Sequence, residues 1–155
     1  MIAIHKPTID DYDAVRALVA EVHALHHAAR GDVYAADAHF SREYYAALLA
    51  DENGFPIAAY DGNELIGFAS GFIKPPNPNP AMLPHRIAYI DDICVHSRCR
   101  GMGIGTLLYN ATVRLAKERG ADTLMLTVWA FNENALRFYK HLGMTERNIN
   151  MEMKL

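Results

Sequence analysis

The chain has 155 residues, of which 51% are hydrophobic and 21% are charged, and this balance excludes a disordered or fibrous protein. We expect one domain spanning residues 1–155, because this length supplies one core without disulfides or metal ions. The formal net charge of −3 provides no basic surface for nucleic acid, and no apolar stretch is long enough to cross a membrane. The N-terminus has no signal-peptide pattern and the chain has only two cysteines, so a cytoplasmic protein is expected.

Apolar periodicity and turn residues predict a mixture of helices and strands. Thr8 and Asp11 form a capping-box pattern before the first helix, and Asn132 is placed as the N-cap of the last one. The predicted elements, in chain order, are a helix over 9–27, a loop over 28–40, a helix from Ser41 to just before 53–54, strands over 57–60, 65–73 and 87–95, a helix over 104–119, a strand over 123–129, a helix from 132 to 143, and one or two strands over 144–155.

Two of these segments have distinctive compositions. Residues 74–84 contain five of the seven prolines, which exclude both helix and ladder hydrogen bonds, so this segment is predicted to be an excursion from the sheet. The strand over 123–129 is apolar enough to be expected in the centre of the sheet.

The segment 100–106, Arg-Gly-Met-Gly-Ile-Gly-Thr, lies between a strand and an amphipathic helix. Glycines allow main-chain N–H groups to converge, the helix N-terminus adds partial positive charge, and Arg100 adds a cation. The pattern predicts a pyrophosphate cradle; a turn needed only for helix–strand packing is the alternative. The spacing fits neither a P-loop, which needs Lys before Ser or Thr, nor the G-x-G-x-x-G dinucleotide motif.

A second pattern follows about 30 residues later, and together the two resemble the GCN5-related N-acetyltransferases (the GNAT family). The first is Arg100-x-x-Gly103-x-Gly105, and the second is Asn132-x-x-Ala135-x-x-Phe138-Tyr139-x-x-x-Gly143. Within that family, the strand from Tyr89 to Val95 is most similar to the spermidine/spermine N-acetyltransferase branch. The resemblance implies an α/β (α+β) fold, with a mixed, mostly antiparallel central sheet, a splayed pair of parallel strands and helices on both faces.

The resemblance also implies acetyl-CoA as co-substrate and no metal. Its pyrophosphate and pantetheine arm would be held by cofactor-binding residues near the two motifs. These residues are Ile93, Cys94, Val95, Arg100, Gly101, Met102, Gly103, Ile104, Gly105, Thr106, Asn132, Ala135 and Tyr139.

The chemistry of amine acetylation predicts a proton acceptor, since an ordinary amine with a pKa of about 10.4 is protonated at neutral pH. Asp91 is the candidate, acting through water. Asp92 is the second candidate, although strand neighbours face opposite sides unless a bulge intervenes. Ion pairing or loop capping is the alternative role for both. The motif predicts that Tyr139 protonates the leaving thiolate, and a core tyrosine is the alternative.

The acceptor is expected to be a small cationic amine or a polyamine, bound near His26, His27, Asp91 and Trp129. The spacing of His23, His26 and His27 is also that of two metal-binding imidazoles or of a polar helix end. Three alternatives to this activity remain: an acyl-CoA sensor without turnover, a domain binding another diphosphate nucleotide, and acetylation of protein or peptide amines. A homodimer is expected and is compatible with the C-terminal strands.

Overall fold

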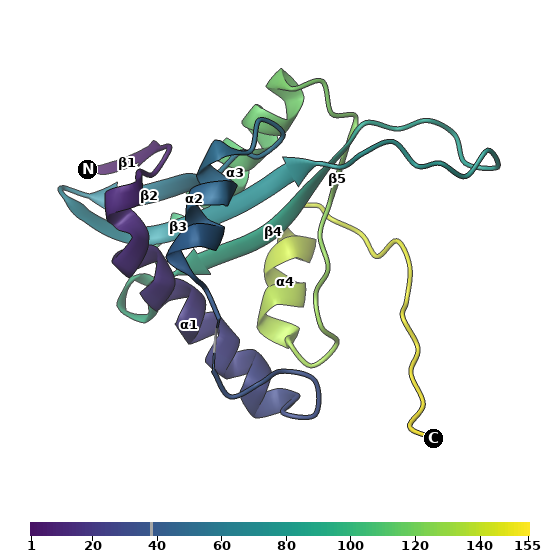
Figure 1. Cartoon of the computed structure of the whole chain (residues 1–155), viewed down its shortest axis with the longest axis horizontal. Helices are drawn as coiled ribbons and strands as arrows, with labels where there is room; N and C mark the ends of the chain where they lie inside the picture. The colour runs from purple at the N-terminus through teal and green to yellow at the C-terminus, as the bar shows by residue number, and fades with distance from the viewer. Residues whose placement is uncertain (38) are drawn as a thin grey trace.

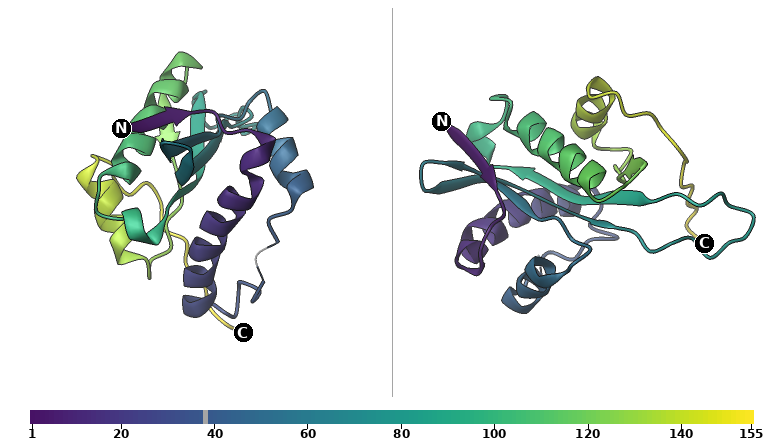
Figure 2. Two further views of the ribbon diagram at one scale, coloured as in Figure 1. Left: turned by 90° about the vertical axis from the view of Figure 1, so that its left-hand side faces the viewer. Right: turned by 90° about the horizontal axis from the view of Figure 1, so that it is seen from above.

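The computed structural model describes residues 1–37 and 39–155; Ala38, part of the predicted 28–40 loop, lies outside the described residues. Helices cover both faces of a twisted sheet (Figures 1 and 2). The strands are β1 (Ile2–His5), β2 (Ile57–Asp61), β3 (Glu64–Ile73), β4 (Ile87–Val95) and β5 (Thr123–Met125). The helices are α1 (Tyr12–Ala29), α2 (Arg42–Ala50), α3 (Ile104–Glu118) and α4 (Glu133–His141), with short 3-10 helices at Ile9–Asp11 and Ser97–Cys99.

The sheet has the order β1-β2-β3-β4-β5 among the described residues. Neighbouring strands are antiparallel except for β4 and β5, which are parallel. The helix α3 connects this parallel pair, as a crossover requires. The predicted mixed, mostly antiparallel sheet with one parallel pair is therefore confirmed.

Both faces of the central strands are buried, which explains their continuous apolar runs. On one face α1 and α2 pack against the sheet, and Val15 and Tyr45 lie in this core with Phe68 of β3. On the other face α3 packs through Ile104 and Leu108. The top view in Figure 2 shows α1 and α2 on one side of the sheet and α3 and α4 on the other.

The predicted helix starts are confirmed. The Asp11 carboxylate accepts a hydrogen bond from the Thr8 amide at 2.7 Å, so the capping box forms with Asp in the place of Glu. It initiates a 3-10 turn, and α1 proper begins at Tyr12. The Ser41 hydroxyl accepts from the Tyr44 amide at 3.0 Å and caps α2.

One strand was missed by the sequence analysis, and two sequence predictions are wrong. The strand β1 was not predicted, because its four residues pair with β2 through their backbone and carry too short a pattern to detect. The strand β5 ends at Met125 and lies at the edge of the sheet, not in its centre. Residues 144–155 form no strand: the Arg147 guanidinium reaches the sulfur of Met125 on β5 at 3.0 Å, but none of the backbone amides of residues 145–155 donates to another described residue.

The proline-rich segment 74–84 forms neither helix nor strand, as predicted, and projects from the sheet with the connection to β4 (Figure 1). In the part of the chain that the structure describes, none of the helices has the length and apolar character needed to cross a membrane.

Candidate active site

The parallel strands β4 and β5 pair only at their beginnings. The register joins Ile87, Ala88 and Tyr89 to Thr123, Leu124 and Met125. Beyond this point β4 continues to Val95, bonded to β3 on one side only. The segment 93–95 therefore offers a free backbone edge on the side that faces away from β3, at the place where the sequence predicts that the pantetheine arm binds.

The glycine-rich turn follows β4 and leads into α3. Gly101 and Gly103 have φ of +79° and +82°, the left-handed region that favours glycine. A Cβ built on either residue meets nothing within 4 Å, so packing does not require glycine here. None of the amides of residues 101–103 donates to another described residue, and the first-turn amides of α3 are free by helix geometry. These open amides at a helix N-terminus fit a pyrophosphate.

Gly105 has a different role. A Cβ at this position would lie 3.2 Å from the ring of Phe138 on α4, so the absence of a side chain allows α3 and α4 to approach closely. The packing interpretation thus holds for Gly105 and not for Gly101 or Gly103. Of the remaining residues predicted for the cradle, Met102 lies on the turn and is largely exposed, whereas Ile104 and Thr106 lie in the first turn of α3.

Arg100 lies at the start of the turn. Its guanidinium donates to the carboxylate of Glu21 on α1 at 3.0 Å and to the carbonyl of Val95 at 3.2 Å. These contacts hold the cation between α1 and the free edge of β4. The exposed ion pair leaves the guanidinium accessible to a phosphate.

A bulge in β4 changes the direction of the two carboxylates. Ile90 pairs with Gly71 and Asp92 with Ser70, so Asp91 is an extra residue on β4. Asp91 and Asp92 consequently lie on the same face of the sheet, toward α2. Burial is the main cause of the raised pKa of Tyr44 on α2, and the charges of both carboxylates raise it further. The sequence named a bulge as the condition for this arrangement, and the structure provides it.

The environments of the carboxylates raise both pKa values. Burial and then the neighbouring charge of Asp91 raise the pKa of Asp92 to about 6. Partial burial raises the pKa of Asp91. A carboxylate with a pKa near 6 is ionised at neutral pH and is a stronger base than an ordinary aspartate, so this pair is suited to accept a proton.

Tyr139 extends from α4 and is half-buried, with its ring 6.4 Å from that of Tyr109. Burial is the main cause of the raised pKa of its hydroxyl, and the nearby Cys94 and Asp92 raise it further. The hydroxyl therefore keeps its proton at neutral pH. Cys94 itself is buried, and burial and Asp92 raise the pKa of its thiol. The thiol is therefore neutral and unsuited to nucleophilic attack.

Asn132 caps α4. Its side-chain oxygen accepts from the amide of Ala135 at 3.1 Å, so both predicted cofactor residues take part in this N-cap. This contact fixes the start of the helix that carries Tyr139.

Most of the predicted acceptor residues lie in an aromatic cluster at the C-terminal end of α1. Trp129 donates its indole N–H to the Tyr34 hydroxyl at 2.7 Å, and the His26 ring stacks on Tyr34. His23 and His27 bond to the backbone carbonyls of residues 35 and 34 at 2.7 and 2.8 Å. His26, His27 and Trp129 are thus brought together, whereas Asp91 faces α2.

Asp91 lines a cavity of about 370 Å³ between α2 and the strands β3 and β4. The Ser70 hydroxyl lies in this wall, is almost completely buried and has no hydrogen-bond partner among the described residues. No sequence signal indicated Ser70, because its position in this wall depends on the register that places it opposite Asp92. The lining residues are Tyr44, Ala47, Leu48, Asp51, Gly54, Ser70, Gly71, Phe72 and Asp91.

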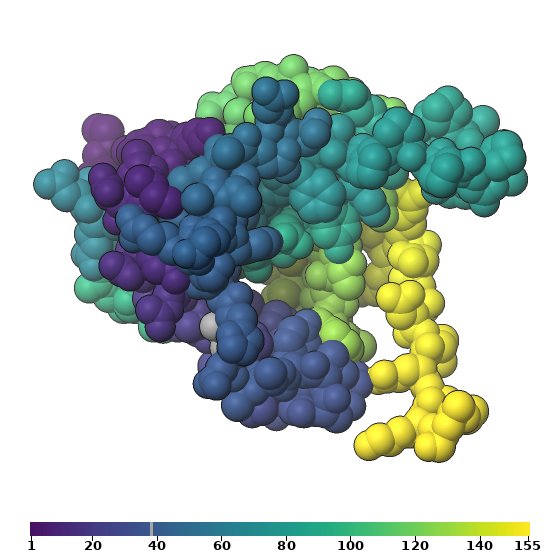
Figure 3. Space-filling model, in the orientation of Figure 1, coloured from purple at the N-terminus to yellow at the C-terminus, as the bar shows by residue number. Residues whose placement is uncertain are grey.

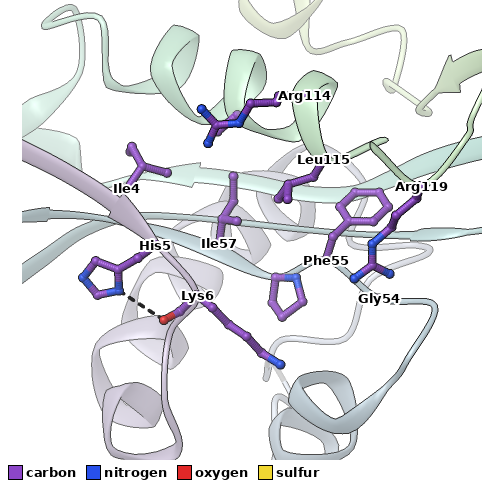
Figure 4. Close-up of a pocket in the computed structure, with 11 residues that line it drawn as sticks. Ile4, His5, Lys6, Gly54, Phe55, Ile57, Arg114, Leu115 and Arg119 are labelled. Carbon is purple, nitrogen blue, oxygen red and sulfur yellow. Dashed lines mark hydrogen bonds between the residues drawn. The ribbon is translucent and has the colours of Figure 1, made fainter. Parts of the chain in front are cut away.

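A second cavity, of about 200 Å³, lies on the opposite side of the sheet, near β1 and α3 (Figure 4). Arg114, Arg119 and Lys6 are among its lining residues, and none of the residues predicted for catalysis or cofactor binding lines it. The Arg119 guanidinium donates to the carbonyl of Glu52 at 2.8 Å, so one of its cations already has a structural role.

Comparison with known proteins agrees with this geometry. The model of the acetyltransferase (GNAT) family matches residues 19–144. An uncharacterized N-acetyltransferase of Methanocaldococcus jannaschii is 33% identical over 71% of this chain and 47% of its own length. The mycothiol acetyltransferase of Paenarthrobacter aurescens is 30% identical over 76% of this chain and 34% of its own length. A crystal structure of a mutant of the BH1408 protein of Bacillus halodurans matches with a TM-score of 0.94 and 29% identity, over 99% of both chains.

The sheet, the glycine cradle and these matches define a GNAT-type acyltransferase domain. The chain belongs to the acetyltransferase (GNAT) family. It spans less than half the length of these two curated relatives.

Proposed function

We propose that the protein is an acetyl-CoA-dependent N-acetyltransferase that transfers the acetyl group to a primary amine by direct attack in a ternary complex. One observation carries the proposal. The bulge brings Asp91 and Asp92 to one face of β4, and the same strand offers a free backbone edge that leads to the cradle at Gly101 and Gly103.

The proposed roles balance the protons of the reaction. A carboxylate of the pair accepts a proton from the ammonium form of the acceptor through water, which leaves a neutral amine. The amine nitrogen bonds to the carbonyl carbon of the thioester, the carbon–sulfur bond breaks, and the nitrogen loses its second proton to solvent. The Tyr139 hydroxyl protonates the departing thiolate. The products are an amide and a free thiol, and no covalent enzyme intermediate is needed, in keeping with the buried, neutral thiol of Cys94.

We propose that the acceptor is a small cationic amine bound in the 370 Å³ cavity beside Asp91. The cavity presents two carboxylate residues, Asp51 and Asp91, with the aromatic rings of Tyr44 and Phe72. The unpartnered Ser70 hydroxyl adds a hydrogen-bonding group for a polar acceptor. A polyamine fits this combination of negative charge and aromatic surface. A place for His26, His27 and Trp129 in acceptor binding stays a prediction.

Two further expectations belong to this proposal. The thiols of Cys94 and Cys99 are free, which supports a reducing compartment such as the cytoplasm. The exposed apolar residues of the C-terminal segment support a homodimer.

The test is an acceptor screen in which free thiol release from acetyl-CoA is measured with spermidine, an aminoglycoside, lysine and a peptide with a free N-terminus. Tyr139→Phe is expected to lower kcat by ten-fold or more and to leave the Kd for coenzyme A within two-fold of the parent value, because it removes the proton donor without altering the cradle. Tyr109→Phe, which removes a neighbouring hydroxyl, is the matched control. Binding of coenzyme A without thiol release for any amine would identify a sensor and contradict the proposal, and so would unchanged turnover in Tyr139→Phe.

A further inference from the structure

The cavity of about 200 Å³ near β1 and α3 combines positive charge with an apolar interior. Lys6, Arg114 and Arg119 line it, and none of its described lining residues is acidic. Figure 4 shows Arg114 and Arg119 on the α3 side of the cavity and Lys6 on the opposite side, after β1. The chain as a whole has a formal net charge of −3, so this concentration of positive charge is a local feature.

Neighbouring carboxylates do not neutralise these cations. Within the described part of the chain, Lys6 and Arg119 form no ion pair. The Arg114 guanidinium approaches the carboxylate of Glu118 at 3.8 Å, on the exposed surface of α3, where an ion pair contributes little. Like charges around one cavity repel each other, so an anion bound between them would stabilise the arrangement.

Two of the cations are held in fixed positions. The Lys6 ammonium donates to the carbonyl of Leu49 at 2.9 Å, and the Arg119 guanidinium donates to the carbonyl of Glu52 at 2.8 Å. The Arg119 guanidinium also lies over the ring of Phe55, 5.7 Å from its centroid. One hydrogen bond leaves further N–H donors on each of these groups. The two cations are therefore preorganised and still able to bind a ligand.

The interior of the cavity is apolar. Phe55, Ile57 and Ala111 line it and are only 3%, 4% and 7% exposed. Figure 4 shows Phe55, Ile57 and Leu115 between the cations. An inorganic anion would leave this apolar surface unused, whereas an organic anion would bury an apolar group against it.

The cavity is separate from the predicted cofactor site. The glycine turn precedes the start of α3, and Arg114 and Leu115 lie near the end of this helix. From Ile104 to Leu115 the helix rises by about 16 Å, at about 1.5 Å per residue. In Figure 3, α1 and α2 cover the near face of the molecule, and α3 is visible only behind them along the upper rim.

We propose that this cavity binds a small organic anion, a carboxylate carried on an apolar ring or a short apolar chain. The cations bind the carboxylate, and the apolar group packs against Phe55 and Ile57. The volume of about 200 Å³ suits a small molecule of this kind. The site is additional to the proposed acetyl transfer.

Titration with sodium benzoate, followed through the backbone amide signals in NMR spectra, tests the proposal. The largest shifts are expected at Phe55, Ile57 and Leu115. Benzamide has the same ring without the charge, and inorganic phosphate has charge without the ring. Each is expected to bind at least ten-fold more weakly than benzoate, because it lacks one of the two interactions.

Arg114→Gln is expected to weaken benzoate binding about ten-fold, because it removes a charged hydrogen-bond donor. Arg137→Gln is the matched control and is expected to leave the Kd for benzoate within two-fold of the parent value. Arg137 forms an i,i+4 ion pair with Glu133 and is 70% exposed, as Arg114 forms one with Glu118 and is 69% exposed, but Arg137 does not line the cavity. If Arg114→Gln is not folded by circular dichroism, Lys6→Gln replaces it with the same expected loss.

The absence of saturable benzoate binding would overturn the proposal. Equal affinity for benzamide or phosphate would contradict the class of ligand, and an unchanged affinity in Arg114→Gln would contradict the site. Saturating coenzyme A is expected to leave benzoate binding unchanged; displacement of benzoate by coenzyme A, or shifts confined to residues 101–106, would mean that the anion binds in the glycine turn. None of these results depends on acetyl transfer, so the proposed function stands or fails separately.

Discussion

Replacing Asp92 with Asn tests the electrostatic environment of the site. The carboxylate is half-buried beside Asp91, and its pKa is raised to about 6 from an ordinary value of 3.8. Asparagine has nearly the same shape and no charge. The substitution therefore removes the cost of burying the charge and retains the packing.

The expected effect follows from linkage between protonation and folding. An acid whose pKa is higher in the folded state is protonated more readily there, so stability decreases as the pH rises from about 4 to about 6 and is constant above. A difference of about two pH units corresponds to roughly 3 kcal/mol at 1.36 kcal/mol per unit. The stability difference between Asp92→Asn and the parent is expected to shift by this amount, in favour of the variant, between pH 4 and pH 8.

The assay is urea denaturation of the variant and the parent at each pH, because the difference between them cancels the titration of all other groups. Asp122→Asn is the control of opposite sign. The Thr123 hydroxyl, the Arg86 amide and His85 lower the pKa of Asp122, so its loss is expected to destabilise the protein above pH 4. A pH-independent difference for Asp92→Asn would refute the reasoning, because it would mean that the charge of Asp92 is compensated in the folded state. Turnover is expected to fall in the same variant if Asp92 is the base.

Three further predictions concern other parts of the site. Gly103→Ala is expected to raise the Kd for coenzyme A, measured by calorimetry, at least ten-fold. Gly62 in the hairpin turn has φ of +59°, so Gly62→Ala introduces a similar backbone strain of about 1–2 kcal/mol and is expected to leave this Kd unchanged. Equal Kd values in the two variants would mean that the glycine turn does not bind the cofactor. Gly71→Ala is expected to lower the free energy of unfolding by about 3 kcal/mol, because its Cβ would lie 2.6 Å from the carbonyl oxygen of Tyr89. A decrease below 0.5 kcal/mol in urea denaturation would show that β3 and β4 separate freely at this point. Partial burial and then the neighbouring His23 lower the pKa of His26, so stability is lost as the pH falls below 6.5. His26→Phe is expected to reduce the fall in Tm between pH 7 and pH 5, and an unchanged fall would contradict a neutral, half-buried ring.

The sequence predicted those features that depend on local chemistry. Thr8 and Ser41 start their helices because a side-chain oxygen near the helix start bonds to a backbone amide nearby. The sequence placed the glycine turn between β4 and α3 and Tyr139 on α4, where the structure has them, because glycine conformation and helix position are local properties. Their roles in cofactor binding and catalysis stay predictions. The shared direction of Asp91 and Asp92 was predicted only conditionally, since it depends on a bulge.

The features that the sequence missed depend on pairing between distant segments. Ser70 lines the cavity because β3 and β4 pair in the register that places it opposite Asp92, and neither strand alone determines that register. The predicted C-terminal strand is wrong for the same reason: residues 149–155 alternate between apolar and polar side chains, yet a strand forms only where the backbone pairs with a neighbouring edge, and these residues make no such pairing within the described part of the chain.

The most direct test of the central claim is hydrogen exchange measured with and without coenzyme A. The account predicts that the cofactor slows exchange at the amides of residues 101–106 and along the free edge at 93–95, and that Gly103→Ala abolishes the effect. Protection confined to the cavity near β1 and α3, or no change at the glycine turn with saturating coenzyme A, would contradict the account.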